Sequence, residues 1–475
     1  MALNYKHTNY VSALSSKQQA LLDKIAVSFD VSDKQLDYIV SKMQSELFRG
    51  LSRNRTSELY MSPSFVHHNI KPQGDTVSLG MSIEATGRRI RIASIYFDSD
   101  GAAAHTETQV FVTPLAVAKS ANKFFDFVAY CIRDFVQSHA LEEYAQTVGY
   151  YLPLGITIGL PVDNKKSNGS FMHCNVSELA KEDSLDLCGK NVGWRLCDSA
   201  LRSYMPVRVT SVTNNVVSAL VAARFHDKGS RVAAAFNHGI NAAYFEKLNL
   251  VEKLSNNSDS TGEEEIAINT EIGRFGSVRD SLPRTMWDRR LDRESRCPNT
   301  RALEKLVADQ YLGEIARNLI TDFVDNLLIF STRTNVHELN TPYVFHTAYM
   351  APIIEDCSEN LTTIETIFTA EFDIETSLAD RQIIRAICQI IAARAARISG
   401  AVLAALVLKA SDPSSSNNVS VALSGALFDV NNDIYEHTVA SMKKLLAKKS
   451  AAHASVYFQD HGDELVGAAV NAACL

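Results

Sequence analysis

Residues 207–246 read VRVTSVTNNVVSALVAARFHDKGSRVAAAFNHGINAAYFE, and this stretch gives the clearest indication of the fold. Valine and threonine dominate its first part, as is typical of a strand, and a longer apolar run follows that suits a helix. Two more apolar runs flank a turn at Asn237-His-Gly239. The predicted order is strand, helix, strand and strand, over residues 207–213, 216–225, 231–236 and 241–246. Such an order indicates an α/β fold.

This stretch joins two halves of the chain, because residues 207–225 end the first half and residues 231–246 open the second. The order strand, turn, strand, helix, strand and helix recurs in both halves, which indicates a pseudo-repeat. Residues 15–50 precede both halves and read as helical. In the first half we expect strands at 78–83, 90–95 and 109–112, a helix at 116–139, a strand at 154–160 and a helix at 192–204. In the second half we expect helices at 301–330, 380–408 and 435–448, with strands at 419–424 and 456–457.

The composition limits the possible classes of protein. A chain of 475 residues holds two or three domains at about 100–200 residues each, and 46% hydrophobic residues suffice to fill their cores. The net charge of -7 does not indicate nucleic-acid binding. The eight cysteines include no CxxC pair, which fits reduced thiols. The N-terminus lacks the apolar core of a signal peptide, so we expect an intracellular, most simply cytoplasmic, protein. Arginines interrupt the apolar residues 383–408, which predicts a core helix rather than a membrane span.

Several motifs, read in order, carry a resemblance to a known family. They are Phe124–Phe135, Leu154-Gly-Ile-Thr-Ile-Gly-Leu-Pro161, Ile268-Asn-Thr-Glu-Ile-Gly-Arg-Phe275, Leu282-Pro-Arg-Thr285, Tyr311-Leu-Gly-Glu314 and Thr341-Pro-Tyr343. Their order and spacing resemble the eukaryotic hexokinase family, in its fungal branch, over roughly residues 60–473. The resemblance implies a two-lobed, actin-like ATPase fold of duplicated ribonuclease H-like domains that closes around a hexose. Members of the family transfer the γ-phosphoryl group of MgATP to the sugar 6-hydroxyl.

The resemblance also implies a division of the chain. Residues 1–73 would form a helical segment packed on the large lobe, residues 74–209 the small lobe, and residues 210–447 the large lobe. Residues 448–475 would return to the small lobe.

Residues matching the family's sugar ligands are present. A hexose needs amides and carboxylates in fixed directions around its ring. The resemblance assigns this role to Asn214, Asn241, Glu271 and Glu304, with Lys181 as the nearest candidate for the family's lysine. In the motif that ends at Pro161, the family has a serine where this chain has Gly159, so one hydroxyl is lost.

The position of the catalytic base departs from the family. Its aspartate falls on Asn215, and an amide has no useful basicity near neutral pH. General-base catalysis is typically worth ~10²–10⁴ in rate, so Asn215 predicts impaired phosphoryl transfer. The alternative is that Asp227, close in sequence, substitutes for the missing base.

The nucleotide site departs as well. Glycine-rich turns let backbone N–H groups approach phosphate oxygens. The first turn reads Glu84-Ala-Thr-Gly-Arg-Arg89, and in the second turn only Gly239 remains of the family's glycines. Arg88 and Arg89 are either new phosphate ligands or a solvated turn. Near the C-terminus, Asp463 and Glu464 would repel a nucleotide. The degenerate nucleotide positions are Glu84, Thr86, Gly87, Arg88, Gly239, Gly425 and Gly467. No metal ligands are expected.

Three hypotheses follow. The first is a catalytically impaired, hexokinase-like protein that binds a hexose and acts as a regulator or sugar sensor. Similar atypical proteins of filamentous fungi suggest carbon-source and protease-gene control, a protein partner, and nuclear or mitochondrial association. The second is an active hexose or hexosamine 6-kinase that uses MgATP. The third is a scaffold that binds neither ligand.

Overall fold

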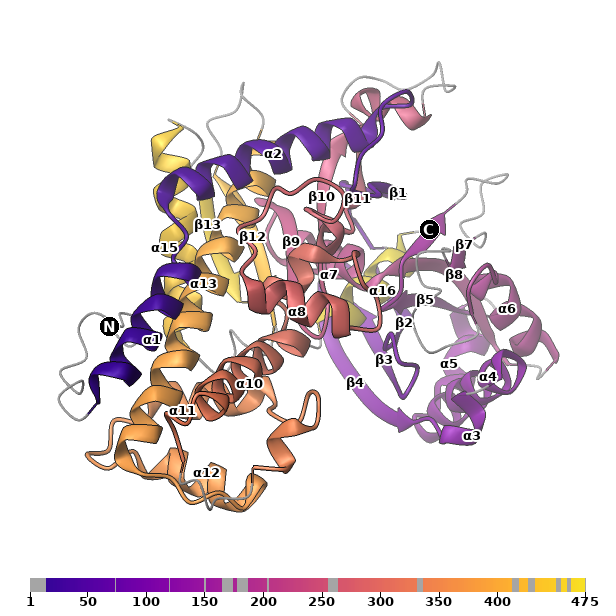
Figure 1. Cartoon of the computed structure of the whole chain (residues 1–475). Coiled ribbons are helices and arrows are strands. Elements are labelled where there is room, and N and C mark those ends of the chain that lie inside the picture. The colour runs from indigo at the N-terminus through magenta and orange to yellow at the C-terminus, as the bar shows by residue number, and fades with distance from the viewer. Residues whose placement is uncertain are drawn as a thin grey trace.

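The computed structural model contains two β-sheets with helices between and around them (Figure 1). It describes residues 14–72, 74–118, 120–148, 151–164, 174–176, 187–202, 205–254, 264–330, 336–411, 418–425, 432–449, 454–458 and 463–474. Each sheet belongs to one lobe. We call them the large-lobe sheet and the small-lobe sheet.

The large-lobe sheet has six strands in the order β1-β11-β10-β9-β12-β13. From β1 through β11 and β10 to β9, each strand is antiparallel to the next, whereas β12 runs parallel to β9 and β13 runs parallel to β12. The bounds are β1 Ser62–His67, β9 Ser230–Phe236, β10 Ile240–Lys247, β11 Glu265–Asn269, β12 Val419–Ser424 and β13 Ala454–Phe458.

The small-lobe sheet has five strands in the order β4-β3-β2-β5-β8. The meander β4-β3-β2 is antiparallel, and β5 and β8 run parallel to β2. The bounds are β2 Thr76–Ile83, β3 Arg89–Phe97, β4 Ala103–Val112, β5 Leu152–Ile158 and β8 Val207–Asn214, with a small β6 (Val162–Asn164) and β7 (Cys174–Val176) pair beside it. An antiparallel meander followed by two parallel strands therefore occurs in both sheets, which confirms the duplicated α/β pattern.

Two helices, α7 (Asn215–His226) and α16 (Asp463–Ala473), lie between the sheets. Helix α7 packs on β9 and β10, helix α16 packs on β2 and β5, and the two helices pack on each other (Figure 1). Helix α7 is buried on nearly every side because apolar sheet or helix surfaces surround it.

Glycines allow this close packing. A Cβ added at Gly80 or Gly155 would lie 2.1 or 1.9 Å from a backbone oxygen of α16. One added at Gly467 would lie 1.8 Å from the backbone oxygen of Ser218 in α7. Gly467, expected at the nucleotide site, therefore has a packing role: it lets α16 lie against α7.

Further helices cover the outer faces of the sheets. The 33-residue α13 (Leu378–Ala410) packs on β9, β10 and β12, and α2 and α15 pack on it in turn. By length and composition α13 could cross a membrane, but 89% of its most apolar 18-residue window is buried inside the protein, as expected of a core helix. The other α-helices of the described residues are α1 Ser16–Phe29, α2 Asp33–Leu51, α3 Leu115–Ala118, α4 Ala121–Ser138, α5 Leu141–Val148, α6 Val192–Arg202, α8 Met286–Glu294, α9 Ala302–Val307, α10 Asp309–Asp325, α11 Met350–Glu355, α12 Thr362–Phe372 and α15 Asn432–Lys448.

Two expected boundaries shift. Strand β8 stays in the small-lobe sheet up to Asn214, beyond the boundary drawn after residue 209. Strand β13 pairs with β12 in the large-lobe sheet, so within the described part of residues 448–475 it is α16 that reaches the small lobe. The strand pairing explains both shifts, because hydrogen bonding to a neighbouring strand assigns a strand to its sheet.

Candidate functional site

Asn214 stands where the small-lobe sheet passes into α7. It ends β8 and caps α7, and its Oδ1 accepts a hydrogen bond from the Val216 N–H at 3.1 Å. Its Nδ2 donates to the Leu160 carbonyl at 2.9 Å. The side chain is 3% exposed, so both contacts hold its amide in one orientation at the end of the strand.

Asn241 connects Asn214 to the large-lobe sheet. Its Nδ2 donates to the Asn214 Oδ1 at 3.3 Å, to the Asn269 Oδ1 at 2.8 Å and to the Glu271 Oε1 at 3.2 Å. Its Oδ1 accepts from the backbone N–H groups of Ala242 and Glu271. Residues from β8, β10 and the end of β11 thus form a continuous network of amides around one carboxylate.

Glu271 carries that carboxylate in a turn directly after β11. Its φ of 55° is in the left-handed region, which an L-residue adopts only when its surroundings require it. Burial raises the pKa of the Glu271 carboxyl above its usual value, while the Asn269 and Asn241 amides, Arg301 and Arg274 oppose that rise.

Glu304 joins the same region from the first turn of α9. It is 6% exposed, its Oε2 accepts from the Ile240 N–H at 3.2 Å, and its Oε1 lies 3.7 Å from the Arg301 guanidinium. Cβ atoms added at Gly239 or Gly273 would lie 2.9 or 3.0 Å from Oε2. The space that Glu304 needs therefore accounts for Gly239, which we had expected at the nucleotide site.

The structure brings Asn214, Asn241, Glu271 and Glu304 together, as the motifs predicted. It adds two residues that the motif comparison did not single out, Asn269 and Gly273. Asn269 was detectable, because it belongs to the Ile268-Asn-Thr-Glu motif that carries Glu271. Lys181 lies outside the described residues.

Asn215 is the first residue of α7 and is half-buried next to Asn214. Asp227 caps the opposite end of that helix, so at 1.5 Å rise per residue it lies roughly 18 Å away. Its carboxylate also accepts from the Gly229 N–H at 2.7 Å. Asp227 therefore lies too far from Asn215 to act at that position.

The first phosphate turn uses its own N–H groups. Gly87 N–H donates to the Glu84 carbonyl at 2.8 Å, Arg88 N–H to the Thr86 hydroxyl at 3.3 Å, and Glu84 N–H to the Arg89 carbonyl at 3.2 Å. The Glu84 carboxylate lies 3.7 Å from the Arg89 guanidinium, and the Arg88 side chain is exposed. A triphosphate would find internally bonded N–H groups and a carboxylate here.

The N–H groups of the second turn are also hydrogen-bonded within the protein. The Ile240 N–H donates to Glu304, the Asn237 N–H donates to the Gly239 carbonyl at 2.9 Å, and His238 lies 3.4 Å from Asp309. Asp309 raises the pKa of His238, and Glu84 of the first turn adds to that effect. These residues do not fit the triphosphate of MgATP, because carboxylates and protein acceptors stand where phosphate donors are needed.

Two C-terminal positions have other roles. Arg91 of β3 forms an ion pair with Glu464, and Ser82 of β2 donates to the same carboxylate at 2.7 Å. The charge of Glu464, expected to repel a nucleotide, is thus compensated by the small lobe. Gly425 directly follows β12 and has a φ of 155°, which favours glycine.

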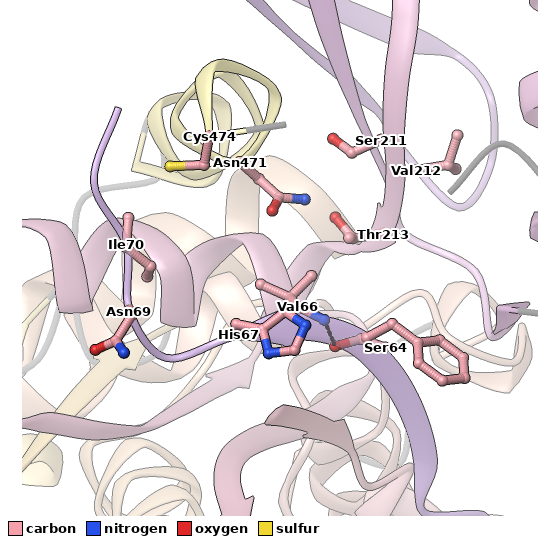
Figure 2. A pocket seen from close by; sticks show the side chains of 11 residues that line it. Ser64, Val66, His67, Asn69, Ile70, Ser211, Val212, Thr213, Asn471 and Cys474 are labelled. Carbon is pink, nitrogen blue, oxygen red and sulfur yellow. Dashed lines mark hydrogen bonds between the residues drawn. The ribbon is translucent and has the colours of Figure 1, made fainter. Parts of the chain in front are cut away.

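A separate cavity of about 140 Å³ lies between β1, the end of β8 and the end of α16 (Figure 2). Its polar lining includes His67, Ser211, Thr213, Asn471 and Cys474. It is not lined by Asn214, Asn241, Glu271 or Glu304. In the part of the chain that the structure describes, no three His, Cys, Asp or Glu side chains gather as metal ligands.

The duplicated sheets define a two-lobed protein of the actin-like fold, with the amide–carboxylate cluster between the lobes. Two family models, both described as hexokinase, match residues 21–225 and 231–474. The chain belongs to the hexokinase family.

Named relatives agree. Hexokinase-2 of Candida albicans is 29% identical over 391 residues, which cover 82% of this chain and 78% of the relative. Hexokinase-1 of Schizosaccharomyces pombe is 25% identical over 461 residues, or 97% of this chain and 92% of the relative. The fold matches that of a Schistosoma mansoni hexokinase complexed with glucose, with a TM-score of 0.82, 24% identity and coverage of 96% of this chain and 99% of the other.

Proposed function

We propose that this member of the hexokinase family binds a hexose in the cluster of Asn214, Asn241, Glu271 and Glu304 but is impaired in ATP-dependent phosphoryl transfer. The observation that carries the proposal is the contrast within one site: the amides and carboxylates that suit a sugar are hydrogen-bonded together, while an amide, Asn215, occupies the base position beside them. The N–H groups of both phosphate turns are hydrogen-bonded within the protein, and this supports the proposed impairment of phosphoryl transfer.

A protein of this kind acts as an intracellular regulator or sugar sensor. A hexose that binds the closed form better than the open form shifts the population toward closure without any chemistry. That shift would change the surface offered to a protein partner. We place this role in carbon-source or protease-gene control, in the cytoplasm with nuclear or mitochondrial association.

Titration with glucose tests the binding half. A ligand that binds only the folded state raises the melting temperature, so glucose should stabilise the wild type. Asn241→Ala should abolish this shift. The control Asn326→Ala, which alters an exposed amide at the end of α10, should keep it. If glucose, fructose, mannose and N-acetylglucosamine all left the melting temperature unchanged and gave no calorimetric heat, hexose binding would be refuted. The hypothesis of a scaffold that binds neither ligand would then stand.

A coupled assay with MgATP tests the catalytic half. We expect the wild type to turn over no faster than Asn215→Ala, and Asn215→Asp to remain slow because the phosphate turns are also altered. If Asn215→Asp alone restored turnover, the argument from the turns would be wrong.

The alternative is an active hexose 6-kinase in glycolysis, which the names of the curated relatives favour. Wild-type turnover clearly above that of Asn215→Ala would establish it. MgATP binding measured by calorimetry would then be expected as well.

A further inference from the structure

Asn269 lies at the centre of the cluster of Asn214, Asn241, Glu271 and Glu304, although the motif comparison assigned it no sugar contact. It is the last residue of β11 and is 3% exposed. Its Oδ1 accepts from the Asn241 Nδ2 at 2.8 Å, and its Nδ2 donates to the Glu271 Oε1 at 2.9 Å. One amide thus joins two of the proposed hexose ligands.

The two ends of an asparagine amide are chemically different, so this arrangement has a direction. The Asn269 oxygen faces Asn241, and its nitrogen faces Glu271. Asn269 therefore requires that the Asn241 nitrogen, and not the Asn241 oxygen, faces it. Both amide donors, from Asn241 and Asn269, go to the Glu271 Oε1. Among the described residues Oε2 has no hydrogen-bond donor, which leaves it for a ligand hydroxyl.

We propose that Asn269 is a positioning residue of the hexose site: it fixes the direction of the Asn241 amide and turns the Glu271 carboxylate so that one oxygen accepts a sugar hydroxyl. This inference rests on the proposed function. Asn269 acts through its two neighbours and needs no contact with the sugar.

The charges around Glu271 give this role a measurable signature. The groups that face the carboxyl are the amides of Asn269 and Asn241 and the cations Arg301 and Arg274, with the Glu304 carboxylate also paired to Arg301. Burial raises the pKa of Glu271, and the Asn269 hydrogen bond is the strongest opposing influence. Removing that bond raises the pKa further, so the carboxylate is lost at a higher pH. Hexose affinity, which needs the ionised acceptor, then falls at a higher pH too.

The test measures the dissociation constant for glucose between pH 4.5 and 8 in three variants. Asn269→Ala removes the donor, and we expect glucose affinity to be about tenfold weaker at neutral pH. The midpoint of the curve of affinity against pH should shift upward by about one pH unit. Asn269→Asp keeps the shape but sets a second carboxylate against Glu271, so its midpoint should shift further. The matched control is Thr270→Val, which removes the hydroxyl that donates to the Ala242 carbonyl at 2.7 Å without touching Glu271. A purely structural loss weakens affinity equally at every pH, and this is the result expected of the control.

Thermal unfolding shows whether each variant is folded. Midpoints of Asn269→Ala and Asn269→Asp equal to the wild-type midpoint would overturn the inference. If the wild type binds no hexose, the proposed function fails, and the inference is then decided without ligand by the carbon-13 titration of the Glu271 carboxyl, assigned with Glu271→Gln. An unchanged titration of Glu271 in Asn269→Ala would overturn it in that case as well.

Discussion

Gly159 shows how one residue is constrained by its neighbours rather than by the ligand. A Cβ added at this position would lie 2.8 Å from the backbone nitrogen of Ala85, and the Gly159 N–H donates to the Ile83 carbonyl at 2.9 Å. Restoring the family's serine by Gly159→Ser should therefore lower the free energy of unfolding by about 1–3 kcal/mol, because a backbone atom cannot move aside cheaply. Urea denaturation measures the change. Ala85→Ser, in the neighbouring turn after β2, controls for the added hydroxyl and should be nearly neutral. An equally neutral Gly159→Ser would contradict the close approach.

At the same scale, the sequence predicted which residues lie together at the candidate site better than it predicted why each residue stands there. Motif order located Asn214, Asn241, Glu271 and Glu304 correctly in one cluster. It could not show that Glu304 explains Gly239, because a glycine's neighbours in space are absent from a linear pattern. The directions of the amides at Asn241 and Asn269 are likewise set by tertiary hydrogen bonds.

Helix α16 illustrates the balance of forces within an element. Alanine is favoured over glycine in a helix by about 1 kcal/mol, so Gly467→Ala would stabilise an isolated helix. Here the new methyl would meet the Ser218 carbonyl oxygen of α7 at 1.8 Å, and also its carbon at 2.6 Å. We expect a net loss of about 1–3 kcal/mol, because the helices must separate to relieve the clash. Chemical denaturation measures it, with Val466→Ala as a control that trims the same helix without a clash. A more stable Gly467→Ala would mean that α7 and α16 are not in contact.

Most elements followed from hydrophobic periodicity, but their ends did not. Residues 15–50 read as helical throughout, yet α1 and α2 are separate helices because the Ser32 side chain and Gln35 form a capping box that starts a new one. Strand β1 was not predicted at all, since its pairing with β11 comes from residues about 200 positions away. Local patterns carry no information about such partners.

At the scale of the whole molecule, the duplicated order of elements predicted two lobes, and each of the two sheets confirms it. What the sequence did not show is how the N-terminal helices are held. Asp33, at the start of α2, accepts Lys444 of α15 at 2.7 Å and Arg397 of α13 at 3.2 Å, so charges more than 360 positions apart in sequence join the first helices to the last.

This junction should respond to pH in a defined direction. The hydrogen bond from Lys444 lowers the pKa of Asp33 below its ordinary value of 3.8, with Lys448 and Arg397 adding to the effect. The folded state therefore holds the ionised form more strongly than the unfolded state does. Its stabilisation is fully present above the ordinary pKa and is lost as the pH falls through the lowered one.

Asp33→Asn should accordingly lower the free energy of unfolding at pH 7, but by at most about 1 kcal/mol, since the pairs are partly exposed and screened by salt. Urea denaturation of the wild type and of Asp33→Asn from pH 7 down to pH 3, at low salt and at 1 M salt, measures the difference between their free energies of unfolding. It should shrink at acidic pH and at high salt. Asp23→Asn in α1, whose exposed carboxylate accepts a hydrogen bond from Gln19 within the same helix, is the matched control and should show no such pH-dependent loss. A difference that persisted unchanged at pH 3 or in 1 M salt would mean that packing, and not the charge of Asp33, holds the N-terminal helices to the large lobe.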